Sequence, residues 1–121
     1  MEAGTGDKAY ELIFDEIIFP LAREYKLQMI IRYGGSDPYF DDGLTNLGLT
    51  FDGFEMIGKK VRELSNELCD NRSVDLLCSG YNLEVLPKIW LTLVAAISGV
   101  KINFKESVPD IRDRKIVKQR I

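Results

Sequence analysis

Histidine is entirely absent from this sequence of 121 residues. Imidazole is the commonest protein ligand for metals such as zinc, and it is the usual general acid or base near neutral pH. A chain without imidazole has only carboxylates, thiols and tyrosines for such chemistry. The absence therefore excludes, for this chain alone, the histidine-based catalytic sites on which most hydrolases rely.

Cysteines and long apolar runs are also scarce. Cys69 and Cys78 are too few for a disulfide framework, so they indicate small buried side chains in a reducing compartment. The longest apolar run, at residues 91–97, is far shorter than the ~20 residues of a membrane helix. The first residues show no basic segment followed by an apolar stretch, so no secretory signal is visible. We therefore expect a cytoplasmic protein without a membrane partner.

The charge is slightly negative and unevenly distributed. The net charge of −3 argues against a general nucleic-acid-binding protein. Residues 101–121 hold seven Lys/Arg and three Asp/Glu, a balance of +4, which leaves −7 for residues 1–100. This tail is either a nucleic-acid-binding arm or an amphipathic helix, and its interspersed acids favour the helix. We predict one folded segment over residues 1–100 and a basic, helical tail over residues 101–121.

Apolar periodicity and breaker residues predict an α/β chain. The predicted elements are a helix near residues 8–21, a buried strand over 27–33, a long loop over 36–49, a helix over 51–68, a strand over 74–78 and a helix over 86–98. Thr50 is the predicted N-cap of the middle helix, and Gly99 is the C-cap of the last one. A strand, a helix and a second strand in this order predict a parallel pair with a crossover connection.

The first helix is predicted from a helically spaced apolar stripe with Asp7 as its N-cap. The stripe consists of Tyr10, Ile13, Phe14, Ile17, Ile18 and Leu21. Pro20 lacks a backbone donor, so we expect a kink or weakening near the last turns. Leu12 and Phe19 lie away from the stripe and suggest burial on more than one side.

Polar residues follow both predicted strands directly. In parallel sheets, ligands bind at the carboxyl ends of the strands. Asp37 follows the first strand and Tyr81 follows the second, so we expect both on one rim of the sheet. Asp37 is a candidate metal ligand or a turn residue that bonds its own loop. Tyr81 is a candidate hydrogen-bond donor or an aromatic side chain that packs against the rim.

Four motifs, in this order, resemble motifs of the histone deacetylases. They are Gly4-Thr-Gly-Asp-Lys-Ala-Tyr10, Gly34-Gly35-Ser36-Asp37 continuing to Asp42-Gly43-Leu44, Leu47-Gly48-Leu49-Thr50 with Gly53-Phe54, and Ser79-Gly80-Tyr81-Asn82-Leu83. The resemblance is strongest to the prokaryotic acetoin-utilization proteins. Order and spacing agree from about Gly4 to Val100, which is nearly the whole chain.

The resemblance implies part of the arginase/deacetylase fold, an α/β sheet with helices on both faces. It implies a relation to zinc-dependent enzymes that hydrolyse acetyl-lysine and related acyl-amides. By resemblance, Asp37 corresponds to a zinc ligand, and Tyr81 to the tyrosine that donates a hydrogen bond to the substrate carbonyl and the oxyanion. Gly35, Gly80 and Asn82 correspond to residues that support the rim.

The departures from the family are as informative as the matches. The paired histidines and the other zinc ligands of the family have no counterpart in this chain. We therefore expect a truncated, deacetylase-like protein that is inactive and binds no zinc by itself. Two alternatives remain open, namely a half-enzyme completed by a separate N-terminal chain and a non-catalytic interaction module. Pro38-Tyr39, Cys78-Ser79 and Arg32 also replace family residues at or near the rim, which suggests relaxed constraint.

Two parallel strands are too few for a stable open sheet, because both strand edges and much helix surface stay uncovered. The expected apolar surface consists of Ile89, Trp90, Leu93, Val94, Ile97, Leu12 and Phe19. We therefore expect this chain to assemble, either as a homo-oligomer, most simply a two-fold dimer, or with a missing N-terminal half.

Overall fold

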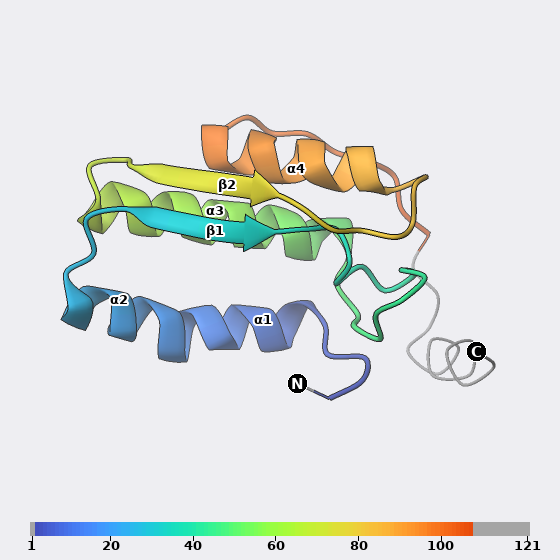
Figure 1. Ribbon diagram of the computed structural model, residues 1–121, viewed down its shortest axis with the longest axis horizontal. Coiled ribbons are helices and arrows are strands. Elements are labelled where there is room, and N and C mark those ends of the chain that lie inside the picture. The colour runs from blue at the N-terminus through green and yellow to red at the C-terminus, as the bar shows by residue number, and fades with distance from the viewer. Residues whose placement is uncertain (1, 108–121) are drawn as a thin grey trace.

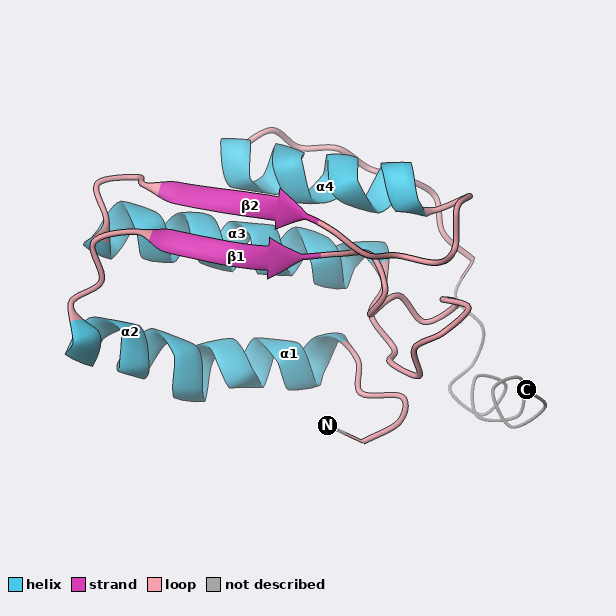
Figure 2. Ribbon diagram, in the orientation of Figure 1, coloured by secondary structure: helices cyan, strands magenta, loops and turns pink. Residues whose placement is uncertain are grey.

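The computed structural model describes residues 2–107, which form a two-stranded parallel sheet against a layer of helices (Figure 1). The elements are α1 (Asp7–Ile13), the π-helical segment η1 (Phe14–Ile18), α2 (Phe19–Tyr25), β1 (Ile30–Gly34), α3 (Phe51–Leu68), β2 (Ser73–Leu77) and α4 (Leu86–Ser98). Figure 2 shows α3 behind the sheet, between the α1–α2 helix and α4. The predicted fold class and element order are confirmed.

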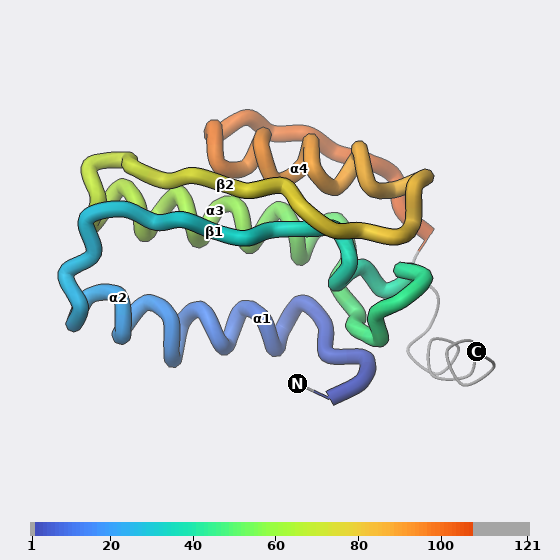
Figure 3. The backbone as a smooth tube through the Cα atoms, viewed as in Figure 1, coloured from blue at the N-terminus to red at the C-terminus, as the bar shows by residue number. Residues whose placement is uncertain are grey.

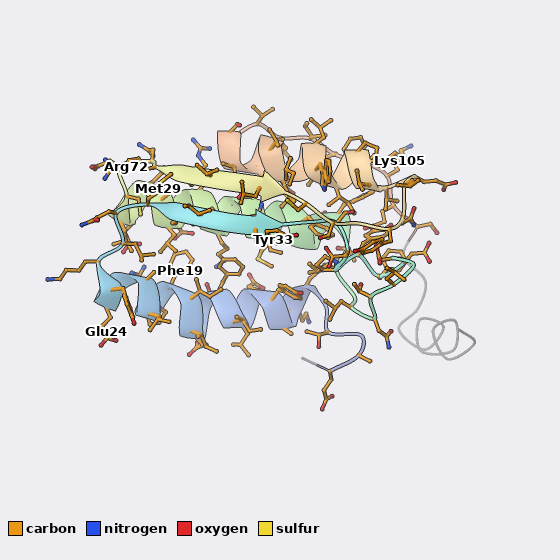
Figure 4. The ribbon with its side chains drawn as sticks, in the orientation of Figure 1. Phe19, Glu24, Met29, Tyr33, Arg72 and Lys105 are labelled. Atoms are coloured by element: carbon orange, nitrogen blue, oxygen red, sulfur yellow. The ribbon has the colours of Figure 1, made fainter. Side chains whose placement is uncertain are left out.

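The first helix is continuous through α1, η1 and α2, and its buried face differs from the predicted stripe. A π-helical segment ends at Ile18, shortly before Pro20, which matches the expected disturbance near the proline. Because a π turn holds more residues than an α turn, Phe14 and Phe19 share the buried side although they are five positions apart. Ile17 and Leu21, which the stripe placed inside, are exposed. Figure 4 shows Phe19 between this helix and the sheet.

The prediction that Asp7 is the N-cap of the first helix is wrong. Gly6 occupies that position, and Asp7 is the first helical residue. The Asp7 carboxylate accepts hydrogen bonds from the backbone N (2.9 Å) and the Oγ1 (2.5 Å) of Thr50. A tertiary contact with the start of α3 has therefore displaced the local cap. Thr50 does cap α3, as predicted, because its side chain accepts from the Gly53 N–H.

The two strands pair in parallel from Ile30 opposite Ser73 to Gly34 opposite Leu77. This register places Arg32 opposite Asp75, and their side chains form a bidentate ion pair with N–O distances of 2.8 and 2.5 Å. The two side chains are only 17% and 9% exposed. A paired, hydrogen-bonded guanidinium explains how an arginine is accommodated in a largely apolar strand.

The main core lies around α3. Its most deeply buried apolar side chains are Phe54, Leu49, Ile89 and Leu93. A Cβ at Gly58 would lie 2.5 Å from the Cβ of Ala96, so glycine permits the close approach of α3 and α4. Cys69 is buried, as expected for a small apolar side chain, and Cys78 is half-buried.

Part of the apolar surface expected to be bare is covered. Ile89 and Leu93 are buried where α4 packs on α3, and Phe19, the first residue of α2, is buried on the side of that helix that faces the sheet. Trp90 and Ile97 are half-buried, whereas Val94 and Leu12 are exposed, as expected. The prediction failed for Ile89 and Leu93 because α4 is apolar on nearly every side and does not reveal which side meets α3. It failed for Phe19 because the π turn brings this side chain to the buried side of the first helix.

One face of the sheet remains bare. The side chains of Ile31, Tyr33, Val74 and Leu76 alternate with covered residues, and 40–72% of each is exposed. We call these four residues the outer sheet face. The register places Ile31 opposite Val74 and Tyr33 opposite Leu76, so the four form one contiguous apolar patch.

Residues 101–107 of the predicted helical tail form no helix, and residues 108–121 lie outside the described part of the chain. No helix between residues 2 and 107 has the length and apolar character that crossing a membrane requires.

Candidate functional site at the strand ends

The carboxyl ends of β1 and β2 bring the two predicted site loops together. Backbone pairing continues past the strands, because the Cys78 N–H donates to Gly34 O (2.8 Å) and the Ser36 N–H donates to Ser79 O (3.1 Å). The segments that carry Asp37 and Tyr81 are therefore adjacent. We call these two segments, residues 35–49 and 78–84, the rim.

Asp37 is anchored from both loops. Its carboxylate Oδ1 accepts a hydrogen bond from the Ser79 hydroxyl at 2.6 Å. Its backbone carbonyl accepts from the Thr45 hydroxyl. The carboxylate thus bonds across to the loop that follows β2, which differs from the simple turn residue considered as an alternative. Sequence reasoning noted Ser79 as a replacement of a family residue but missed it as a partner of Asp37.

Ser79 takes a conformation that glycine normally adopts. Its φ angle of 65° is left-handed, which costs a side-chain-bearing residue about 1–2 kcal/mol. The hydrogen bond to Asp37 helps to offset this cost.

Gly35 and Gly80 are the glycines that this arrangement requires. A Cβ at Gly35 would lie 2.1 Å from the Cys78 carbonyl oxygen and 2.2 Å from Ser79 Oγ. Gly80 has a φ angle of 141°, and its Cβ would lie 1.9 Å from the Oγ of Ser36. Both positions therefore support the rim by leaving space for close backbone approach.

Asp42 is the central anchor of the rim, and sequence reasoning missed it. The residue is 5% exposed, and its carboxylate accepts three backbone N–H bonds, from Leu44 (2.9 Å), Thr45 (3.1 Å) and Tyr81 (2.9 Å). The first two bonds form a local Asx-type turn, for which the Asp-Gly-Leu pattern is an available signal. The third, to a residue 39 positions away, has no such signal.

Tyr81 projects from a fixed backbone. Its N–H is held by Asp42, while the residue as a whole is 53% exposed. Next to it, Asn82 donates from Nδ2 to the Asp41 carbonyl (2.9 Å) and accepts from the Glu84 N–H (3.2 Å). Asn82 thus ties the rim to the approach of α4.

Tyr10, which the sequence placed in a helix stripe and at the end of a family motif without a role at the rim, lies within electrostatic reach of Asp37. Burial raises the pKa of the Tyr10 phenol above its ordinary value, and the negative charge of Asp37 raises it further. The phenol is therefore protonated at neutral pH and is a neutral neighbour of the rim.

The donor set of this chain does not fit a catalytic zinc ion by itself. Such sites use three protein ligands. Across residues 2–107, no three side chains of His, Cys, Asp and Glu gather in a way that suits a metal ion. The one candidate carboxylate, Asp37, already accepts a hydrogen bond from Ser79.

Comparison with solved structures defines the fold. The structure of the histone deacetylase Clr3 superposes with a TM-score of 0.74 and 21% sequence identity, over 97% of this chain and 19% of that chain. The chain therefore has a part of the histone deacetylase, or arginase/deacetylase, fold.

Sequence comparison identifies the family. The family model described as histone deacetylase domain matches residues 1–97. The chain belongs to the histone deacetylase family, and the resemblance noted from its motifs is confirmed.

Curated relatives agree with this assignment. A probable deacetylase from Archaeoglobus fulgidus is 37% identical over 101 residues, which are 83% of this chain and 28% of that protein. The acetoin utilization protein AcuC of Staphylococcus xylosus is 25% identical over 100 residues, which are 82% of this chain and 26% of that protein. The chain thus spans less than a third of the length of these relatives.

Proposed function

We propose that this chain is the rim-bearing segment of a deacetylase-like protein of the acetoin-utilization type, and that it is catalytically silent by itself. The observation that carries the proposal is the state of Asp37. It is the one side chain matching a zinc ligand of the family, its Oδ1 is bonded to Ser79, and the chain has no histidine. The general base and the remaining ligands would have to come from elsewhere.

Within a completed site, we propose that Asp37 contributes a metal ligand and that Tyr81 contributes a hydrogen bond to the substrate carbonyl. The substrate class would be acetyl-lysine or a related acyl-amide. Support for the role of Tyr81 comes from its half-exposed side chain on a backbone fixed by Asp42. A phenol carried on a fixed backbone is positioned to donate to developing negative charge.

Zinc content tests the first part of the proposal. After dialysis, the purified chain should contain no stoichiometric zinc, because a single carboxylate holds the ion weakly. Elemental analysis and sedimentation are performed on the same sample, so that metal shared between chains is recognised. One zinc ion per chain in a monomer would overturn the proposal.

Hydrolysis of acetyl-lysine peptides tests the second part. The chain alone should release acetate no faster than buffer does. Turnover that disappears in Tyr81→Phe would contradict catalytic silence. Turnover that persists in that variant would identify a contaminating enzyme.

A half-enzyme is the second candidate, and the outer sheet face favours it. Ile31, Tyr33, Val74 and Leu76 lie bare on a sheet of only two strands, where additional protein would bury them. Coding DNA for the family's histidine motifs next to this gene would support a separate completing chain. Co-expression with that chain should then yield zinc-dependent activity that Tyr81→Phe abolishes. Co-expression without any gain in activity would exclude this candidate.

We propose that the isolated chain covers the same face by self-association, most simply as a dimer. We also propose a cytoplasmic location, supported by the two free cysteines.

A further inference from the structure

The segment that follows α4 lies beyond the family match, which ends at residue 97. Gly99 ends α4 in a left-handed conformation, and the chain then runs back along α4 toward the rim (Figure 3). Along residues 101–107, exposed and half-buried positions alternate: Ile102, Phe104 and Glu106 are half-buried, and Lys101, Asn103, Lys105 and Ser107 are exposed. This period of two is typical of an extended segment that lies with one face on the protein.

An aromatic row connects this segment to the rim. The ring of Phe104 lies 5.8 Å from that of Phe51, the first residue of α3. Phe51 in turn stacks on Tyr39 at 5.5 Å between ring centroids. Both Phe51 and Tyr39 are buried, and Tyr39 is only two residues from Asp37. Phe104 is therefore connected, through Phe51 and Tyr39, to the loop that carries Asp37.

Glu106 makes a second connection beside the first. Both of its carboxylate oxygens lie 3.2 Å from the backbone N of Phe51. The carboxylate also accepts a hydrogen bond from the Tyr39 hydroxyl. The N-terminus of α3 favours a negative group at this position. One side chain thus bonds both the start of α3 and the rim loop.

We propose that residues 101–107 form a strap, fastened by Phe104 and Glu106, that holds the rim loop in place, and that Glu106 is a positioning residue for Asp37. The strap stands on contacts within this chain. Only its consequence for Asp37 rests on the proposed function.

The charges around Glu106 make the strap sensitive to pH. Burial raises the pKa of the Glu106 carboxyl above its ordinary value, and the nearby charges of Asp52 and Asp7 raise it further. Hydrogen bonds from Tyr39 and the Phe51 N–H oppose that shift. Because folding raises this pKa, the contribution of Glu106 to stability is complete below pH 4.5, the ordinary pKa of the group. That contribution declines as pH rises through the pKa that Glu106 has in the folded chain.

Hydrogen exchange on the whole chain tests the strap directly. The reporters are the N–H groups of Phe40 and Leu49, which donate to the carbonyls of Leu49 (2.9 Å) and Pro38 (3.0 Å) inside the rim loop. Glu106→Ala and Phe104→Leu should each lower the protection of these amides about tenfold, as expected for losing one hydrogen bond or part of one ring contact. The Cys78 amide, bonded to Gly34 O between the strands, should change little.

Matched controls lie on the outward face of the same segment. Lys105→Ala and Asn103→Ala remove exposed side chains and should leave the protection of Phe40 and Leu49 unchanged. Glu106→Gln keeps an acceptor for the Phe51 N–H, so it should retain protection and abolish its decline with rising pH. Equal protection in Glu106→Ala and Lys105→Ala would overturn the proposal, as would an unchanged pH dependence in Glu106→Gln. Zinc binding by the intact chain would overturn the proposed function and leave this result untouched.

Discussion

The outer sheet face lies on β1 and β2 and the rim lies in the loops that follow them, yet the side chains of these two regions differ in how far this chain provides their contacts. At the rim, the polar side chains of Asp42 and Ser79 find their partners inside this chain. On the outer face, the apolar side chains of Ile31 and Tyr33 remain 66% and 72% exposed. The polar groups of the rim are thus bonded within this chain, whereas the outer sheet face is left exposed.

The largest effect is expected from breaking the rim at Asp42. Asp42→Ala leaves three backbone N–H groups without their acceptor and should destabilise the chain by about 3 kcal/mol. Urea unfolding measures this change. Asp41→Ala, which removes an exposed neighbouring carboxylate, is the control and should change stability by less than about 0.5 kcal/mol. Equal stabilities of the two variants would show that the Asp42 bonds contribute nothing.

Removing apolar groups from the outer face should act on assembly rather than on the fold. Covering one such side chain contributes about 1.5–3 kcal/mol, so Ile31→Thr with Leu76→Thr should weaken self-association at least tenfold. Sedimentation at micromolar concentration measures this, and Leu83→Thr, at the exposed rim, is the control. A wild-type chain that is already a monodisperse monomer would refute the assembly proposal and the picture of an incomplete sheet.

A smaller effect on stability is expected at Ser79, where two variants separate its hydrogen bond to Asp37 from its left-handed backbone conformation. Ser79→Ala loses the bond to Asp37 and keeps the left-handed strain, so it should cost about 1.5 kcal/mol. Ser79→Gly loses the same bond but relieves about 1 kcal/mol of strain, so its stability should lie close to that of the wild type. Thermal unfolding compares the variants. Identical losses in both would mean that the backbone at this position is unstrained.

The smallest expected effect concerns Tyr10. Asp37→Asn removes a negative charge near the phenol, so the pKa of Tyr10 should fall. It should remain above 10.0, because burial is the larger cause of its rise. Titration of the Tyr10 ring signals by NMR measures the shift, with Asp41→Asn as the control. An unchanged value would place Asp37 and Tyr10 farther apart than the structure does.

Local patterns predicted the elements well because their causes are local. Thr50 begins α3 and Gly99 ends α4 through bonds and dihedral angles within a few residues, and both were identified from the sequence. Asp7 was assigned as a cap by the same rule and was wrong, because Thr50, 43 positions away, competes for its carboxylate. Ile89 and Leu93 were expected to be bare because a sheet of two strands was expected to leave helix surface uncovered, but the packing of α4 on α3 buries them.

The amino-acid sequence by itself determined the α/β class, the parallel pair, the rim positions of Asp37 and Tyr81 and the family, because periodicity, turn residues and motif spacing are all written in neighbouring positions. It also determined that no imidazole is available within this chain. Only the tertiary structure decided that Asp42 holds Tyr81, that Ser79 holds Asp37 and that Glu106 reaches Phe51, because each pair is 39 to 55 positions apart. Partners at that separation are determined by how the strands and helices pack together, which no local sequence pattern specifies.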